Sequence, residues 1–370
     1  MHSVISSALV VRVAAVVLAA MSACAVAQIP AEYPSNYRQI IARANVEGKL
    51  RVYSTTDVPA AAPLLKEFEA LFPQIKVEYT KLNSPELHNR FLSESAANGH
   101  SADILWSSAM ELQMKLANDG YAAVYKSPEA PYLPPWAVWR DEAFGTTFEP
   151  AVFVYNTRAL GGDDIPQTHA DFIRVLKAKP EKFLGNVTAY DIEKAAVGFL
   201  LMTQDSQAMP MFWTLAQALG AANVELEANT STMLERIASG KQILGYDLLG
   251  SYAMARAKHD PSLGVVLPKD YTLVLSRVML IAKNALNPNA ARLWVDFLLS
   301  KRGQTIIAER SQLFSVRPDV TGEFTAASLV RTLGASAKPI AVGPGLLVHL
   351  DYVKRQEFIK RWRNAMTKTK

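Results

Sequence analysis

The sequence predicts an α/β protein built from sheets covered by helices, and three observations support this class. Short strand-like segments alternate along the chain with longer helix-like segments, which is the order that forms parallel sheets. The chain has 370 residues, of which 50% are apolar, and a single core stops growing at about 250–300 residues, so two domains are expected. The single cysteine, Cys24, lies near the N-terminus, so stability must come from the core rather than from disulfide bonds.

The first part of the chain shows the clearest alternation. Helices are predicted over residues 37–46, 63–72, 87–97 and 110–118, and strands over residues 50–53, 76–79 and 102–106. In the second of these helices Leu64, Phe68 and Leu71 share one face, as expected for a helix that packs on a sheet. Gly120 is predicted to end the fourth helix. Together these segments predict a parallel sheet with helices on its faces.

Two short hydroxyl-rich loops lie where α/β sheets bind ligands. Ser54, Thr55, Thr56 and Asp57 follow one predicted strand, and Ser107 and Ser108 follow another. Ligands of open α/β sheets bind outside the carboxyl ends of the strands, where helix N-termini attract negative charge. The alternative is simple helix capping, for which Ser, Thr and Asp are preferred residues. Because the two loops fall at equivalent positions of one sheet, we expect them to bind a ligand.

Later loops supply tyrosines and carboxylates in a similar position. Residues 146–156 form an extended run, and residues 185–189 then lead to Tyr190 and Asp191. A further strand-like run leads to Tyr246 and Asp247, before a helix that contains Tyr252. Aromatic rings beside hydrogen-bonding groups could orient a small polar solute. The alternative left open is that these rings pack in the core with their hydroxyl groups at the surface.

The segment from Leu273 to Arg302 carries the most specific pattern in the chain. An apolar strand leads into Lys283, Ala285, Asn287, Pro288, Ala290 and Ala291, and a helix then ends near Ser300, Gly303 and Gln304. This pattern resembles a recurrent segment of bacterial solute-binding proteins, the capture components of ABC importers. Tyr155-Asn156 resembles the end of that family's crossing between lobes, and His169 stands in a helix start where the family usually has Trp.

The resemblance implies a type II two-lobe periplasmic binding protein fold. Each lobe would be a mainly parallel sheet with flanking helices, joined by extended crossover strands, with residues 28–150 and 276–370 in the first lobe and 151–275 in the second. It also implies hinge closure on a ligand and delivery to an ABC permease and ATPase. The expected ligand-binding residues are Ser54, Thr55, Thr56, Asp57, Ser107, Ser108, Tyr155, Tyr190, Asp191, Tyr246, Asp247, Tyr252 and Arg317. Of these, Ser54, Thr55, Ser107, Asp191 and Tyr246 are expected to face one cleft.

The expected solute is small, polar and anionic, either phosphorylated or carboxylated. The loops offer hydroxyls, amides and helix N-termini, and Arg277 or Arg317 could add a charge-assisted pair. The acidic residues near the same loops would suit a cationic or polyhydroxylated solute equally well. A ferric ion is the second hypothesis, because the resembled branch includes ferric-ion-binding proteins. Their two adjacent tyrosines, His and Glu are matched poorly: Tyr252 precedes Ala253, and Asp57 stands where His is expected.

A secreted hydrolase is the third hypothesis, with Asp57, Asp191 or Asp247 as paired carboxylates. Against it, the sequence contains no HExxH, GxSxG, Walker or GxGxxG motif. The histidines are far apart and lack metal-ligand spacing. We therefore predict no catalytic residue, no metal site and no cofactor.

The N-terminal residues predict export. An apolar run, Val13 to Met21, precedes a small-residue cleavage site ending at Ala27, so residues 1–27 are predicted to be a signal peptide and the mature protein periplasmic. A less favoured hypothesis is a lipoprotein anchored at Cys24. The net charge of +5 is modest, and the basic C-terminal segment also contains Phe358 and Trp362 at helical spacing, so we predict a packed helix and no nucleic-acid binding. No obligate oligomer is indicated, and a monomer is expected.

Overall fold

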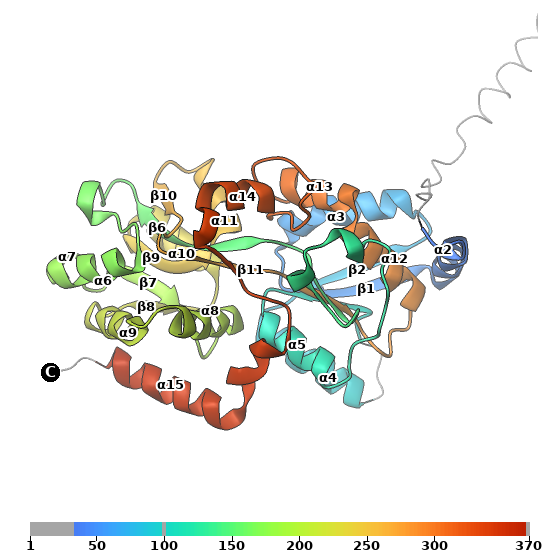
Figure 1. Ribbon diagram of the computed structural model, residues 1–370, viewed down its shortest axis with the longest axis horizontal. Helices are drawn as coiled ribbons and strands as arrows, with labels where there is room; N and C mark the ends of the chain where they lie inside the picture. The colour runs from blue at the N-terminus through green and yellow to red at the C-terminus, as the bar shows by residue number, and fades with distance from the viewer. Residues whose placement is uncertain (1–32, 98–100, 368–370) are drawn as a thin grey trace, which may run out of the picture.

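The computed structural model describes residues 33–97 and 101–367. The predicted signal peptide and the alternative lipid anchor at Cys24 lie outside these residues. Figure 1 shows two groups of strands and helices side by side, one formed mainly by the early part of the chain and the other by its middle. Within the described part of the chain, no helix combines the length and the apolar character needed to cross a membrane.

The first sheet has six strands in the order β2-β1-β3-β12-β5-β4. They are β1 (Lys49–Ser54), β2 (Lys76–Lys81), β3 (Ile104–Ser107), β4 (Val138–Trp139), β5 (Ala143–Gly145) and β12 (Val278–Ile281). The helices of this half are α2 (Tyr37–Glu47), α3 (Val58–Leu71), α4 (Ser84–Ala96), α5 (Met110–Asn118), α12 (Pro288–Leu299) and α13 (Lys301–Glu309). Phe68 of α3 and Trp294 of α12 meet edge to face, 5.2 Å between ring centres, in one core with Trp106 of β3.

The second sheet has seven strands. Six follow the order β13-β11-β6-β9-β7-β8, and β10 pairs with β6. The strands are β6 (Glu149–Asn156), β7 (Val187–Tyr190), β8 (Glu225–Glu227), β9 (Leu244–Leu249), β10 (Leu263–Val266), β11 (Thr272–Leu275) and β13 (Ala337–Pro339). The helices of this half are α6 (His169–Ala178), α7 (Pro180–Phe183), α8 (Ala196–Ala208), α9 (Phe212–Ala221), α10 (Thr230–Ser239) and α11 (Gly250–Ala257).

The predicted helices and strands of the first part of the chain are confirmed within a few residues, with one larger difference. Helix α3 begins at Val58 and contains Pro63 inside it, whereas the sequence predicted a start at residue 63. Proline is common in the first turn of a helix, where its missing N–H costs nothing, but Pro63 lies inside α3. Gly120 follows α5 with φ of 82°, and Tyr121 N–H donates to Leu116 O, which is the expected helix ending.

Both sheets are mixed rather than mainly parallel. Strands joined through helices pair in parallel, as predicted: β1 with β2, β1 with β3, and β7 with both β8 and β9. The strands next to the crossings between the sheets, β6, β11 and β12, add antiparallel pairs. These strands enter each sheet directly from the other sheet, without the helical crossover that a parallel connection needs.

The chain passes directly from a strand of one sheet to a strand of the other twice. The first crossing lies between Gly145 and Glu149, and the second lies at Ser276 and Arg277, between β11 and β12. The C-terminal part of the chain adds a third connection between the two halves. In the second half, β13 joins the sheet and α15 (Tyr352–Met366) packs on α9. In the first half, the turn at Pro344–Leu350 packs on α5. Figure 1 shows α15 alongside α9. The predicted lobe boundaries fall beside the two crossings, and the division into lobes remains a prediction.

The residues that carried the family resemblance have specific structural roles. Asn287 precedes α12, and its backbone and side-chain nitrogens each donate to the carboxylate of Asp103 at 2.9 Å. Ser300 caps α13, and a Cβ on Gly303 would lie 2.0 Å from the carbonyl oxygen of Phe297. The buried Gln304 donates to Thr146 O, next to the first crossing. The motif therefore builds the turn between α12 and α13 and ties it to the crossing.

Candidate functional site

A cavity of about 310 Å³ lies between the two halves of the molecule. The described residues of the first half that line it are Thr55, Asp57, Lys81, Leu82, Asn83, Ser84 and Ser108. Those of the second half are Tyr190, Val197, Ala228, Asn229, Thr230, Ser231, Leu249 and Tyr252, and Arg277 of the second crossing completes the wall.

Four helices begin at this cavity. Asp57, Asn83, Asn229 and Leu249 directly precede α3, α4, α10 and α11, and all four line the wall. Asn83 and Asn229 cap their helices by accepting from Glu86 N–H and Thr232 N–H, at 2.8 and 2.9 Å. The positive ends of the helix dipoles and the unsatisfied N–H groups of the first turns favour a negative ligand.

Arg277 sits at the crossing beside the cavity and is fully buried. Its Nε and Nη2 donate to the two carboxylate oxygens of Glu149 at 2.8 and 3.0 Å, and its Nη1 donates to Thr56 Oγ1 at 3.1 Å. The ring of Tyr252 lies 5.1 Å from the guanidinium carbon. Glu149 therefore neutralises most of the charge of Arg277, and the guanidinium serves chiefly to join β6, the β1–α3 loop and the second crossing.

The charges that face the cavity are few. Among the described lining residues Asp57 is the only carboxylate, it pairs with Lys81 at 3.3 Å, and no histidine is present. Tyr252 OH accepts from Asp57 N–H at 3.1 Å, and Tyr190 OH shares a hydrogen bond with Thr230 Oγ1 at 2.5 Å. Burial raises the pKa of Tyr252, which keeps its phenol neutral. The donor set suits a polar anion better than a hard cation, which needs several anionic oxygens.

The structure brings five of the predicted site residues to the cavity: Thr55, Asp57, Ser108, Tyr190 and Tyr252. Arg277, considered from sequence as a charge partner, is there as well. Thr55 Oγ1 accepts from Ser108 N–H at 3.0 Å, so the two hydroxyl-rich loops are in direct contact. They lie together because each follows one of two neighbouring parallel strands, β1 and β3.

The hydroxyl groups of three predicted residues accept hydrogen bonds that stabilise these loops, and they do not line the cavity. Ser54 Oγ accepts from Thr56 N–H at 3.0 Å, and Ser107 Oγ accepts from Ala109 N–H at 3.1 Å. Thr56 is buried and accepts from Arg277. The capping alternative therefore describes Ser54 and Ser107 better than ligand contact does.

Four predicted residues of the second half also lie away from the cavity. Tyr246 and Asp247 are buried in the middle of β9, because this strand continues to Leu249 instead of ending at residue 246. Asp191 accepts from Glu193 N–H and pairs with Lys194 at 3.1 Å. Tyr155 lies near the far end of β6, against Gly264. The expectation that Ser54, Thr55, Ser107, Asp191 and Tyr246 face one cleft is met only by Thr55.

Arg317, expected to reach the ligand from the first lobe, is buried in an ion-pair network instead. Its Nη1 pairs with Glu129 at 2.5 Å, and its Nε pairs with Asp319 at 2.8 Å. Tyr132 covers the guanidinium carbon at 4.6 Å. The structure does not place this arginine at the cavity.

Sequence reasoning missed two of the loops that line the cavity. Asn83-Ser84 follows β2 and Asn229-Thr230-Ser231 follows β8, and each precedes a helix. They show the same signal as the loops that were predicted, a polar capping residue between a strand and a helix. Strand β8 has only three residues, two of them exposed, so its own sequence pattern is weak.

Two sheets with flanking helices, double crossings and a cavity lined from both halves define a two-lobe binding protein. Comparison with known proteins identifies the family: residues 63–332 match the model of bacterial extracellular solute-binding proteins, and the chain belongs to this family. The members of the family bind solutes, so the chain is a solute-binding protein and not an enzyme, which removes the hydrolase hypothesis. No curated protein sequence matches the chain.

Solved structures agree with this assignment. The substrate-binding protein of an ABC transporter from Agrobacterium tumefaciens is 42% identical over 86% of this chain and 94% of that chain, with a TM-score of 0.82. AfuA from Actinobacillus pleuropneumoniae, solved with fructose-6-phosphate, is 18% identical over 86% and 98% of the two chains, with a TM-score of 0.71. Iron-bound HitA from Pseudomonas aeruginosa is 17% identical over 86% and 99%, with a TM-score of 0.68. The last two similarities show the fold alone.

Proposed function

We propose that this protein captures a small anionic organic solute, phosphorylated or carboxylated, for an ABC importer. The observation that carries the proposal is the convergence of four helix N-termini on a cavity whose lining, among the described residues, contains a single carboxylate. The volume of about 310 Å³ is at the lower end of ligand pockets, which suits a small solute.

The similar proteins support both parts of this proposal. The Agrobacterium protein serves an ABC transporter, and AfuA carries a sugar phosphate. We infer that this chain works with a membrane permease and a cytoplasmic ATPase, acts as a monomer, and is exported to the periplasm by residues 1–27, which are then removed. The iron bound by HitA makes a ferric ion the second candidate, and its support in this chain is the pair Tyr190 and Tyr252 in the cavity wall.

The test is the thermal midpoint of the purified protein with sugar phosphates, phosphonates, carboxylates, amines, neutral sugars and chelated ferric ion, followed by calorimetry on each compound that raises it. A ligand that binds only the folded protein stabilises it by about 2.7 kcal/mol at one hundred times its dissociation constant. We expect a shift with an anionic organic class. A shift only with ferric ion, with a coloured tyrosinate complex, would support the second candidate and contradict the first.

Two substitutions at the cavity determine the sign of the ligand charge. Lys81→Gln removes the cation that faces Asp57, and we expect the affinity for an anion to fall about tenfold. Asp57→Asn frees Lys81 and should leave that affinity equal or higher, whereas a cationic ligand would lose affinity. The side chain of Asp57 makes no capping hydrogen bond to α3, so the helix start is preserved. The matched control is Lys76→Gln, at the opposite end of β2 and paired with Glu69.

A further inference from the structure

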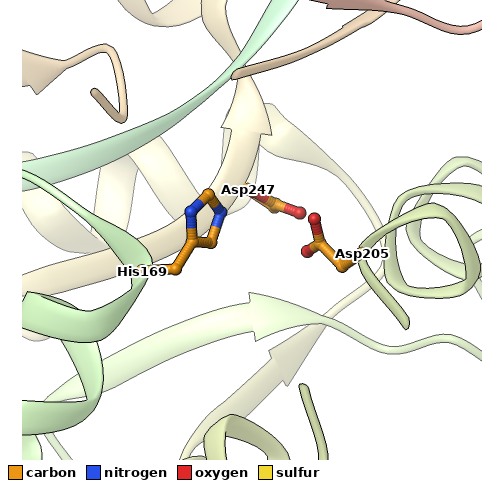
Figure 2. Close-up of side chains that lie close together, drawn as sticks. All are labelled: His169, Asp205 and Asp247. Carbon is orange, nitrogen blue, oxygen red and sulfur yellow. The ribbon is translucent and has the colours of Figure 1, made fainter. Parts of the chain in front are cut away.

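A buried cluster of polar side chains lies inside the second lobe, away from the cavity. Its members are His169, the first residue of α6; Asp205, near the end of α8; and Asp247, in β9. Their exposed fractions are 1%, 0% and 2%. One ring nitrogen and one oxygen from each carboxylate all lie within 4.8 Å of one another. Figure 2 shows the imidazole and the two carboxyl groups directed toward a common point.

The charges of this cluster are not balanced by the side chains around it. No lysine or arginine in the described part of the chain forms an ion pair with Asp205 or Asp247. The Oδ2 atom of Asp247 is buried and has no hydrogen-bond partner among the described residues. Two buried carboxylates facing each other are strongly unfavourable, so this arrangement calls for a cation between them or a proton on one of them.

The surrounding hydrogen bonds orient the cluster as the outer ligands of a metal site do. His169 Nδ1 lies 2.9 Å from Asp270 Oδ1, and Asp270 Oδ2 accepts from His169 N–H at 3.0 Å, which leaves Nε2 for the cluster. The ring of Tyr271 stacks on the imidazole at 4.1 Å. Tyr246 and Tyr271 donate to the two oxygens of Asp205 at 2.6 and 2.8 Å. A carboxylate that fixes a ligating histidine, and donors that fix a ligating carboxylate, are typical of metal sites.

We propose that His169 Nε2, Asp205 and Asp247 bind one divalent transition-metal ion, with Zn²⁺ as the best-fitting class. One imidazole nitrogen with two carboxylate oxygens suits zinc, whereas calcium prefers six or more oxygens. Zinc lies about 2.0–2.2 Å from such atoms, so two ligands of a tetrahedral ion are about 3.3–3.6 Å apart. The three atoms lie within 4.8 Å of one another, so binding the ion would draw them together by up to about 1.3 Å. Water would supply the fourth ligand of a tetrahedral ion.

The ion would tie together three elements of the second lobe. Helix α6, helix α8 and strand β9 each contribute one ligand. Val197 near the start of α8 and Leu249 at the end of β9 line the solute cavity, so the site supports that wall from behind without contacting the solute. This role is structural and does not depend on which solute the cavity binds.

The test begins with the unmodified full chain. We expect metal analysis after dialysis against micromolar Zn²⁺ to find about one ion per chain, and a chelator to lower the thermal midpoint. Co²⁺ should occupy the same site and give visible absorption bands of a low-symmetry site with nitrogen and oxygen ligands. Asp247→Asn should abolish this binding, and asparagine tolerates the φ of 56° at this position. His169→Gln should have the same effect.

The matched control is His259→Gln, which removes an exposed histidine of the same lobe. We expect it to keep the ion. Loss of the ion in this variant to the same degree as in His169→Gln would place the metal on the surface and overturn the proposal. No bound ion in the unmodified chain, with no effect of the chelator, would show that Asp205 and Asp247 share a proton instead. Both results come from proteins that fold, so failure of one variant to fold leaves the test intact.

Discussion

At the scale of single residues, Glu111 is the side chain for which burial has the clearest consequence. It lies in α5, is 3% exposed, and neither carboxylate oxygen has a hydrogen-bond partner among the described residues. Desolvation by burial raises the pKa of Glu111 from 4.5 to about 8. The folded protein therefore keeps a proton between pH 4.5 and 8 that the unfolded chain has released.

We expect this proton to make the protein less stable as the pH rises. Because the folded state binds more protons in that window, the free energy of unfolding falls with pH, by about 1.4 kcal/mol per unit from this residue. The contribution is fully present below pH 4.5 and is lost as the pH approaches 8. Glu111→Gln should match the unmodified protein near pH 5 and exceed its stability near pH 8, as measured by urea unfolding.

The control for this prediction is Glu86→Gln, an exposed residue in the first turn of α4. Its stability should follow that of the unmodified protein at every pH. Burial also raises the pKa of Asp296 to about 7, with the same sign of effect, but all three proteins retain this residue. Parallel curves for Glu111→Gln and the unmodified protein would show that Glu111 is ionised in the fold.

Single residues also show where prediction of the site from sequence succeeds. Thr55 and Ser108 were found because each directly follows a strand of the first sheet, and both reach the cavity. Tyr246 and Asp247 were misplaced because the end of β9 was placed three residues too early, which turned core positions into loop positions. The buried cluster could not be predicted, because its ligands are 36 and 42 residues apart and only the packing of α6, α8 and β9 brings them together.

At the scale of elements, the contact between α8 and β7 depends on Gly198. A Cβ at this position would lie 2.3 Å from Cβ and 2.9 Å from Cγ of Tyr190, which is a wall residue of the cavity. We expect Gly198→Ala to push the helix away from the strand and to cost about 1–3 kcal/mol of stability, measured by denaturant unfolding. Affinity for the solute should fall as well, because Tyr190 must move.

The control is Gly161→Ala, at an exposed position with extended backbone and no atom within 4 Å of the added carbon. Its stability should stay within about 0.5 kcal/mol of the unmodified protein. Unchanged stability in Gly198→Ala would mean that α8 can shift freely, contrary to the tight packing on β7.

The elements differ in how well their sequences predict them. The strand and helix segments that form parallel pairs could be predicted because each has its own apolar pattern and its own caps. The antiparallel pairs could not, since β6 acquires its partners β9 and β11 far along the chain after the first crossing, and β12 returns to the first sheet only after the second. The pairing of β13 with β11 is likewise set by tertiary contact. The three residues of β13 include a lysine and a proline, so this segment has no apolar strand pattern of its own.

At the scale of the whole molecule, two polar contacts join the halves across the cavity, and α4 and α5 of the first half pack on α8 of the second half. Asp57 N–H donates to Tyr252 OH at 3.1 Å, and Ser231 Oγ lies 3.5 Å from Asp57 Oδ2. Closure of the halves on a solute depends on a ligand that touches both of them, since a ligand shifts such an equilibrium only by its preference for one state. The crossings at residues 146–148 and at Ser276-Arg277 are the places where a hinge can bend.

We therefore expect the radius of gyration, measured by small-angle X-ray scattering, to fall when a solute found in the thermal screen is added. Tyr252→Phe removes the direct hydrogen bond across the cavity and so destabilises the closed form by about 1 kcal/mol, which lowers the affinity about fivefold. The radius of gyration of the saturated variant should equal that of the saturated unmodified protein. Tyr132→Phe is the control, because its ring covers Arg317 away from the cavity. A solute that binds without changing the radius of gyration would show that the cavity is preformed and that no hinge closure accompanies capture.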